Sequence, residues 1–213
     1  MADFKAIIFD CDGVLFESHR ANLAYYNRIF AEFNYPLIND PLSVEAHICH
    51  TASSPVVLSK LMHEPDVAAA LHFAQGIDYR EFIPLMTESS GLKSSLSRLA
   101  EIFSLAVATN RGNSMQEVLT HFGLAHFFKV IVTSRDVEKP KPAPDMLLLV
   151  ARQLGVEPGA CLFVGDSELD QVAATKGRMP FVAFGETLKI GRRIHTHTEL
   201  TEMLLDGKNC EVF

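Results

Sequence analysis

The stretch KAIIFDCDG at residues 5–13 decides the fold, because an apolar run stops there abruptly at acidic residues. A short apolar run bounded by turn-forming residues is typical of a strand that is buried on both faces. Similar apolar runs occur at 104–108, 129–132, 161–164 and 180–184. The sequence therefore predicts five buried strands, the first of which ends at a pair of aspartates.

Segments with helical periodicity separate the later strands. They lie at roughly 113–122, 144–154 and 168–177, with apolar residues three or four positions apart. Strands that alternate with helices of this length indicate an α/β fold. We therefore expect a doubly wound, mostly parallel sheet with helices on both of its faces.

A long interval between the first and second predicted strands interrupts this alternation. No good strand is expected from about 17 to 90, and helical patterns lie there near 18–33, 55–63 and 65–74. A right-handed crossover between parallel strands needs only one helix, so the extra residues form a lobe of their own. The predicted organisation is a core of residues 1–16 plus 91–213 and an inserted helical domain of residues 17–90.

The composition excludes some classes of protein. The 213 residues include 19 Lys and Arg against 26 Asp and Glu, which gives a formal net charge of −7. With 48% hydrophobic and 21% charged residues, the chain has the composition of a globular protein. A nucleic-acid binder needs a clustered basic face, and no run of several Lys or Arg occurs. We therefore expect no nucleic-acid partner.

The cysteines and the apolar runs bear on the cellular compartment in which the protein works. The four cysteines are far apart and form no CxxC pair, so neither a disulfide framework nor a usual zinc site is expected. The N-terminus lacks the pattern of a secretory signal, and no apolar run approaches the ~20 residues needed to cross a bilayer. We expect a cytoplasmic protein without a membrane partner, either a monomer or a homodimer.

Polar residues that suit chemistry follow the predicted strands. Asp10 and Asp12 follow the first strand, residues 109–111 follow the second, Lys141 lies after the third, and residues 165–170 end the fourth. In an open parallel sheet the carboxyl ends of the strands lie along one edge, where ligands bind. We therefore expect these residues to meet in one crevice.

The residue types in this crevice suit phosphoryl chemistry. Asp10 and Asp166, side by side, would repel each other unless a cation lay between them, and carboxylate oxygens without His or Cys select Mg²⁺. The Thr109 hydroxyl and the Lys141 ammonium suit phosphoryl oxygens. A carboxylate held against a metal-bound phosphate can attack it, which forms an aspartyl phosphate, and a second acid such as Asp12 can move the proton.

Four motifs resemble those of the haloacid dehalogenase-like (HAD) hydrolases. They are FDCDGVLFES at 9–18, ATNR at 108–111, KPAPD at 141–145 and GDSELD at 165–170, in the order found in that family. Residues 173–180 are also similar to the phosphoglycolate phosphatase-like branch. The resemblance implies a Rossmann-like core that carries a small helical cap and hydrolyses phosphate esters with Mg²⁺.

The resemblance implies a role for each acidic residue of these motifs. Asp10 would be the nucleophile and a Mg²⁺ ligand. Asp12 would be the general acid/base, and its backbone carbonyl would also bind the metal. Asp166 would complete the metal site, and Asp170 would position a metal-bound water or Lys141. Capping of the following helix is an alternative role for one of Asp166 and Asp170.

The remaining motif residues would bind the substrate. The resemblance implies that Thr109 and Lys141 hold the phosphoryl group and assist catalysis. Asn110 and Arg111 are candidate substrate-binding residues, although either could instead cap the helix that follows. Lys139, two residues before Lys141, would replace it if the register of the loop differed.

Departures from the family pattern narrow the reaction. The dehalogenases lack the second acid, so Asp12 disfavours dehalogenation. The hexose-phosphate mutases carry a His where this chain has Asn22, which favours a phosphatase. Glu17 stands where Asp is usual and Arg111 where many phosphatases have Lys, and neither change is expected to affect the core mechanism.

The leading interpretation is a Mg²⁺-dependent phosphatase that hydrolyses a small phosphorylated metabolite, with phosphoglycolate as the best single candidate. The main alternative is a phosphosugar mutase of the β-phosphoglucomutase type, and a pyrophosphatase or a nucleotidase also fits. More distant alternatives are a phospho-accepting signalling domain and an inactive binding module. A receiver domain has no helical lobe, and the intact acidic residues argue against an inactive relative.

A cluster of His47, Cys49 and His50 lies in a stretch that we expect to be a loop between cap helices. A zinc site is disfavoured because no second pair of ligands follows. These residues are therefore expected to be ordinary polar residues of the cap. Selection of the substrate is the alternative, because a loop there would face the crevice.

Overall fold

The computed structural model describes residues 4–188 and 191–205 and contains a six-stranded sheet. Its strands, in the order β5-β4-β1-β6-β7-β8, are Phe128–Thr133, Ser104–Thr109, Ala6–Phe9, Cys161–Gly165, Phe181–Phe184 and Arg193–Ile194. Every neighbouring pair is parallel. The prediction of a parallel α/β sheet is therefore confirmed, and the five predicted strands are all present.

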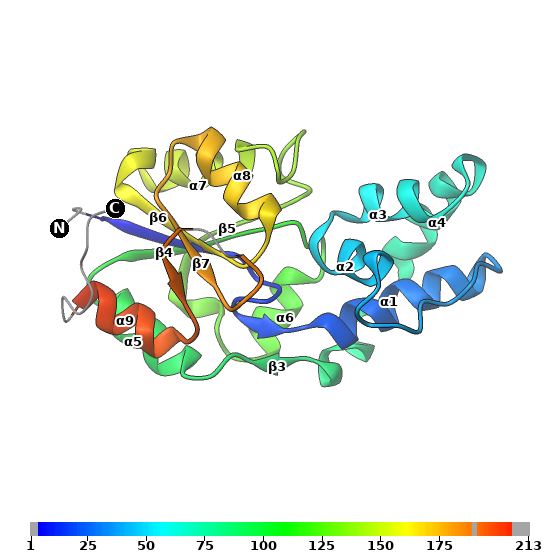
Figure 1. The fold of residues 1–213 in the computed structure, drawn as a ribbon, viewed down its shortest axis with the longest axis horizontal. Coiled ribbons are helices and arrows are strands. Elements are labelled where there is room, and N and C mark those ends of the chain that lie inside the picture. Colours follow the sequence, from blue (N-terminus) through cyan, green and yellow to red (C-terminus); the bar gives the residue numbers. More distant parts are fainter. Residues whose placement is uncertain (1–3, 189–190, 206–213) are drawn as a thin grey trace.

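Helices cover both faces of the sheet (Figure 1). On one face lie α7 (Asp145–Leu154) and α8 (Glu168–Gly177), and on the other lie α5 (Leu92–Ala100), α6 (Met115–His121) and α9 (His197–Leu205). Successive side chains of a strand point to opposite faces. Strand β1 accordingly gives Ala6 and Ile8 to the core beneath α7 and α8, and Ile7 and Phe9 to the core beneath the other helices. This double burial explains the uninterrupted apolar run of β1.

The inserted lobe, here called the cap, lies at one end of the core and contains four helices followed by two 3₁₀ turns, Tyr79–Glu81 and Ile83–Leu85 (Figure 1). The helices are α1 (His19–Glu32), α2 (Val44–Thr51), α3 (Ser54–Leu61) and α4 (Glu64–Gly76). The cap has a hydrophobic cluster of its own, in which Ile29, Val57 and Leu58 are fully buried. The cap therefore has a core of its own, although Ala21 of α1 and Tyr79 belong to one of the two cores of the sheet.

A two-stranded antiparallel ribbon lies where the chain passes between core and cap. Strand β2 (Phe16–Glu17) pairs with β3 (Thr87–Glu88). The prediction that no strand lies from 17 to 90 is wrong at these ends, because strands of two residues show no periodicity. Short 3₁₀ turns complete the connections at Tyr79–Glu81, Ile83–Leu85, Ala125–Phe127 and Pro158–Ala160.

The prediction of a loop around His47 and His50 is also wrong, because both residues lie in α2. This helix is only eight residues long and contains β-branched and His residues, which are weak helix formers. Its N-terminus is stabilised by the Ser43 side chain, which accepts a hydrogen bond of 3.1 Å from the Ala46 amide. An N-cap residue of this kind stabilises a helix by ~1 kcal/mol. Ser43 was therefore the feature of the sequence that could have indicated a helix here.

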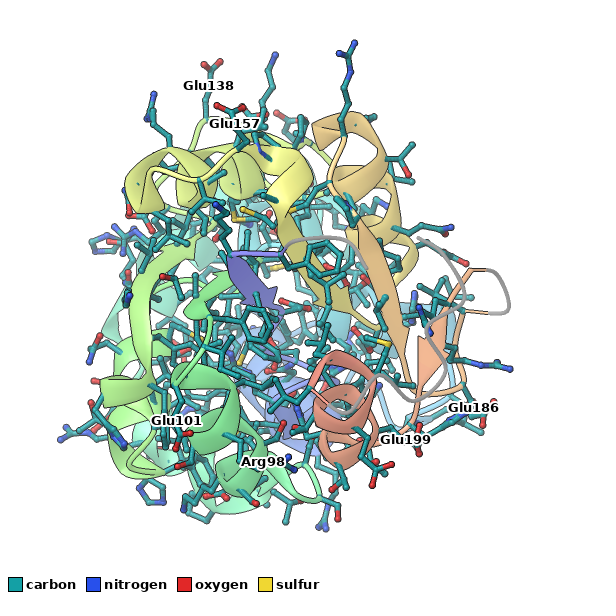
Figure 2. All side chains as sticks on the ribbon, turned by 90° about the vertical axis from the view of Figure 1, so that its left-hand side faces the viewer. Arg98, Glu101, Glu138, Glu157, Glu186 and Glu199 are labelled. Carbon is teal, nitrogen blue, oxygen red and sulfur yellow. The ribbon has the colours of Figure 1, made fainter. Side chains whose placement is uncertain are left out.

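Several exposed acidic residues of the core point outward. Figure 2 shows Glu101, Glu138, Glu157, Glu186 and Glu199 at the periphery of the molecule, and all five are exposed. In the described part of the chain, every helix is too short or too polar to span a bilayer.

Neighbouring valines of α3 test whether the cap depends on its own core. Val57 is fully buried in the cap cluster, whereas Val56 is 38% exposed. Val57→Ala is expected to lower the free energy of unfolding by about 2 kcal/mol, because it removes buried methyl groups and leaves a cavity. Val56→Ala should change it by less than about 0.5 kcal/mol. Urea unfolding of both variants checks this, and equal losses would contradict it.

Candidate active site

The loop after β1 turns sharply so that two acidic residues reach the cap side of the sheet. The Asp10 amide still belongs to the strand, since it donates to the Val164 carbonyl at 2.9 Å. Gly13 follows with φ of +78°, which favours glycine. A Cβ atom on Gly13 would collide with the Asp166 carboxylate. Glycine at this position therefore allows the end of β6 to approach the loop that carries Asp10 and Asp12.

Lys141 holds two buried carboxylates together. Its Nζ lies 2.7 Å from Asp10 Oδ1 and 2.6 Å from Asp170 Oδ1. The other Asp170 oxygen accepts hydrogen bonds from the amide (3.0 Å) and hydroxyl (2.5 Å) of Ser167, the N-cap of α8. Asp170 thus has both roles considered from the sequence, since it caps the helix and anchors Lys141. Lys139 is exposed, so Lys141 is the lysine that reaches Asp10.

Three carboxylates form a group that suits a cation. Single oxygens of Asp10, Asp166 and Asp170 all lie within 4.8 Å of one another. Burial, and then the neighbouring carboxylates, raise the pKa of Asp10 to about 7 in spite of Lys141. Burial and Asp170 likewise raise the pKa of Asp166 well above its usual value. One ammonium does not balance three carboxylates, and a donor set made only of carboxylate oxygens fits a hard divalent cation.

Asp12 belongs to a different cluster. Its side chain forms a buried ion pair with the Arg111 guanidinium and also accepts hydrogen bonds from Ser18 Oγ (2.5 Å) and Asn22 Nδ2 (3.1 Å). Burial opposes ionisation of Asp12, but Arg111 holds the pKa of its carboxyl well below the usual range. The expectation that Arg111 would not affect the core mechanism is therefore wrong, because Arg111 touches the predicted general acid/base directly.

The other two candidate site residues of the second motif, Thr109 and Asn110, lie at the end of β4. Thr109 is buried, and its hydroxyl accepts a hydrogen bond of 3.1 Å from the Arg111 amide. Asn110 Nδ2 donates to the Thr51 carbonyl of the cap at 3.0 Å and to the Lys141 carbonyl at 3.1 Å. All eight predicted site residues therefore gather at one edge of the sheet, and Asn110 also joins the core to the cap.

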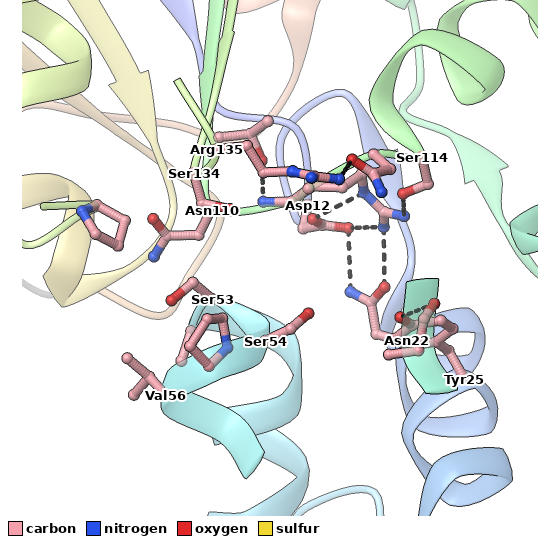
Figure 3. Close-up of a pocket in the computed structure, with 18 of the residues that line it drawn as sticks. Asp12, Asn22, Tyr25, Ser53, Ser54, Val56, Asn110, Ser114, Ser134 and Arg135 are labelled. Carbon is pink, nitrogen blue, oxygen red and sulfur yellow. Dashed lines mark hydrogen bonds and ion pairs between the residues drawn. The ribbon is translucent and has the colours of Figure 1, made fainter. Parts of the chain in front are cut away.

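A cavity of about 510 Å³ lies between core and cap. Asp10, Asp12 and residues 109–114 line its core side. Tyr25, Ser53 and other cap residues line the opposite side (Figure 3). Among the described cap residues that line it, none carries a formal charge, because burial lowers the pKa of His50 to about 4. The cap therefore faces the catalytic edge with hydroxyl groups, aromatic rings and a neutral imidazole.

Some residues of the site were missed from the sequence. Ser18 lay in the first motif but was assigned no role, Tyr79 gave no signal, and Asn22 drew notice only as the position where mutases carry His. The interpretation of His47, Cys49 and His50 as a zinc site gains no support. In the described part of the chain, the carboxylates of Asp10, Asp166 and Asp170 are the only group that could hold a metal ion. Cys49 instead packs in the core of the cap.

Comparison with known proteins places this site in a family. A family model described as haloacid dehalogenase-like hydrolase matches residues 7–184. The chain belongs to the haloacid dehalogenase-like hydrolases. The phosphoglycolate phosphatase of Pasteurella multocida is 31% identical to this HAD hydrolase over 185 residues, which cover 82% of each protein. The phosphoglycolate phosphatase of Escherichia coli K12 is 32% identical over 107 residues, 47% of this chain and 42% of that protein.

A solved structure agrees with this assignment. A HAD-superfamily hydrolase of subfamily IA, variant 1, from Geobacter sulfurreducens is 38% identical and superposes with a TM-score of 0.81. The match covers 94% of this chain and 99% of the other. Family membership and these relatives confirm the predicted fold and identify the chain as a hydrolase that acts on phosphate esters.

The raised pKa of Asp10 predicts a pH-dependent stability of this HAD hydrolase without divalent cations. The folded protein holds the Asp10 proton up to about pH 7, whereas the unfolded chain releases it near 3.8. The stabilisation is therefore complete below pH 3.8 and is lost as the pH rises through 7. Asp10→Asn removes this titration. In urea unfolding with EDTA, wild type should lose a few kcal/mol relative to Asp10→Asn between pH 4 and 7, and a difference that does not vary with pH would contradict this.

Proposed function

We propose that the protein is a Mg²⁺-dependent phosphatase that hydrolyses a small phosphorylated metabolite through an aspartyl-phosphate intermediate. The observation that carries this proposal is the buried group of Asp10, Asp166 and Asp170 around Lys141, beside a cavity. Mg²⁺ held by this group would supply positive charge to the phosphoryl oxygens. The chemistry within the cavity then belongs to the side chains.

Asp10 is proposed as the nucleophile. Its carboxylate attacks phosphorus, and Lys141 and Thr109 hold the oxygens of the phosphoryl group as charge develops on them. Asp12 gives a proton to the leaving oxygen and later takes one from the water that hydrolyses the aspartyl phosphate. In this scheme Asp166 and the backbone carbonyl of Asp12 complete the metal site.

The cap supports hydrolysis by limiting access of water and by selecting the leaving group. A cavity of about 510 Å³ suits a metabolite rather than a macromolecule. Enclosure of the reacting groups strengthens the electrostatic interactions among them and prevents side reactions. Two relatives are phosphoglycolate phosphatases, so we propose phosphoglycolate or a close analogue as the substrate.

A panel of phosphorylated metabolites tests the choice of substrate, with released phosphate as the readout. Phosphoglycolate is expected among the substrates with the highest kcat/KM. Conversion of a sugar phosphate into its isomer without net release of phosphate would instead support the mutase of the β-phosphoglucomutase type.

The nucleophile is tested by Asp10→Asn. Because an amide cannot attack phosphorus, turnover of 4-nitrophenyl phosphate is expected to fall at least ~1000-fold. Asp40→Asn is the matched control, since Asp40 is an exposed acidic residue of the cap. It should keep the wild-type rate. Undiminished turnover by Asp10→Asn would exclude Asp10 as the nucleophile.

Metal dependence is tested by removing divalent cations. Treatment with EDTA followed by gel filtration is expected to abolish phosphate release, because three carboxylates would then face an anionic substrate with only Lys141 to offset them. Addition of Mg²⁺ should restore the original rate, whereas Na⁺ at equal ionic strength should not. Full activity in protein shown to lack metal by elemental analysis would contradict the proposal.

A further inference from the structure

The formal charges that line the cavity come from its core side. The described cap residues around it carry none, whereas the core contributes acidic residues and two arginines, Arg111 and Arg135. Arg111 is buried, and the ion pair with Asp12 balances its charge. Arg135 is exposed and forms no ion pair with any described residue. Its positive charge is therefore left for something that enters the cavity.

Arg135 lies at the same edge of the sheet as the candidate catalytic residues. Thr133, the last residue of β5, is paired with Thr109 in the parallel ladder, so the loops that follow the two strands start side by side. The Ser134 amide donates to the Arg111 carbonyl at 3.4 Å, which joins these loops. Figure 3 shows Arg135 on the core side of the cavity, across from the start of α3. Its side chain thus lies beside the predicted phosphoryl-binding residues and opposite the cap.

The Arg135 side chain is held in place although it is exposed. Its Nη1 donates to the side-chain oxygen of Asn113. Its aliphatic part lies next to Gly112, where a Cβ atom would be 3.9 Å from Arg135 Cδ. Within the described residues, the edge formed by Nε and Nη2 has no hydrogen-bond partner. The parallel N–H groups of such an edge match the two oxygens of a carboxylate.

The acidic residues nearby do not neutralise Arg135. Asp136 turns back into its own loop, where its Oδ2 accepts hydrogen bonds of 2.7 Å from the amide and the hydroxyl of Thr133. Glu138 is one of the residues around the cavity, but its carboxylate points outward in Figure 2. Glu117, on α6, forms no ion pair with Arg135 either. The guanidinium is therefore available to an anionic group of a bound molecule.

We propose that Arg135 is a specificity-determining residue that binds a carboxylate on the leaving group of the substrate. This inference rests on the proposed phosphatase function and narrows its substrates to phosphate monoesters of small hydroxy acids. The phosphoryl group lies at Asp10, so the rest of the substrate occupies the cavity, where Arg135 meets it. An arginine that Asn113 already holds loses little freedom when it binds the substrate. Closure of the cap over the pair lowers the local dielectric constant and strengthens it.

Two substrates that differ in the carboxylate test this role. Phosphoglycolate carries a carboxylate where ethyl phosphate carries a methyl group. The wild type is expected to hydrolyse phosphoglycolate with a kcat/KM at least ~10-fold higher than that for ethyl phosphate. In Arg135→Gln, kcat/KM for phosphoglycolate should fall ~10–100-fold, chiefly through a higher KM, while kcat/KM for ethyl phosphate should change less than about threefold.

The ratio of the two kcat/KM values separates this role from a merely structural one. Losses of the same size with both substrates, or a ratio that Arg135→Gln leaves unchanged, would overturn the inference and leave the phosphatase function in place. A wild type without preference for phosphoglycolate would do the same. If the wild type with Mg²⁺ releases phosphate from no ester at all, the proposed function itself is overturned.

A conservative variant gives a second measurement. Arg135→Lys keeps the positive charge but lacks the two parallel N–H groups. Its preference for phosphoglycolate over ethyl phosphate should lie between those of the wild type and Arg135→Gln. A preference no greater than that of Arg135→Gln would contradict an electrostatic role for this side chain.

Arg152 provides the matched control. It is an exposed arginine of α7 that does not line the cavity. Arg152→Gln changes the net charge of the chain by the same amount as Arg135→Gln, so its preference for phosphoglycolate should match that of the wild type. An equal loss of preference in Arg152→Gln would show that the overall charge, rather than contact with the substrate, causes the effect, and would overturn the inference.

Discussion

Repulsion among four buried carboxylates is the constraint on which the rest of the site depends. The strand ends bring Asp10, Asp12, Asp166 and Asp170 together, and unpaired buried charge is costly. The structure divides the problem between two buried cations. Lys141 forms ion pairs with Asp10 and Asp170, whereas Arg111 forms one with Asp12. Two acids that are only two residues apart in the sequence therefore lie in different electrostatic surroundings, one raised in pKa and the other lowered.

The cap does more than cover the cavity. Asn22 and Tyr79 belong to the inserted lobe, yet both contact the guanidinium that neutralises Asp12. A change in the cap at Asn22 or Tyr79 therefore also acts on the ion pair of Asp12 and Arg111. The lining of the cavity and the orientation of Asp12 are thus physically connected, because residues of the inserted lobe contribute to both.

Much of the core was predictable, because the burial of each strand or helix is visible in the pattern of its own neighbouring residues. Strand β1 shows its burial on both faces as an unbroken apolar run, and the acids at its end point to the edge where the site lies. What could not be predicted depends on contacts across long separations. Tyr79 meets Asn22 from 57 residues away, and Arg111 meets Asp12 from 99. Short elements were also missed, since β2 and β3 have two residues each and α2 is short and contains several weak helix formers.

The ribbon of β2 and β3 sets the two ends of the inserted lobe side by side, with Phe16 opposite Glu88 and Glu17 opposite Thr87. For the sheet, the whole cap is therefore equivalent to one tight hairpin loop, whatever its size. A lobe of different shape can be exchanged at this point during evolution without lengthening or shifting any strand. The same geometry marks Phe16 and Glu88 as the natural junctions for transplanting a cap from a related enzyme onto this catalytic platform.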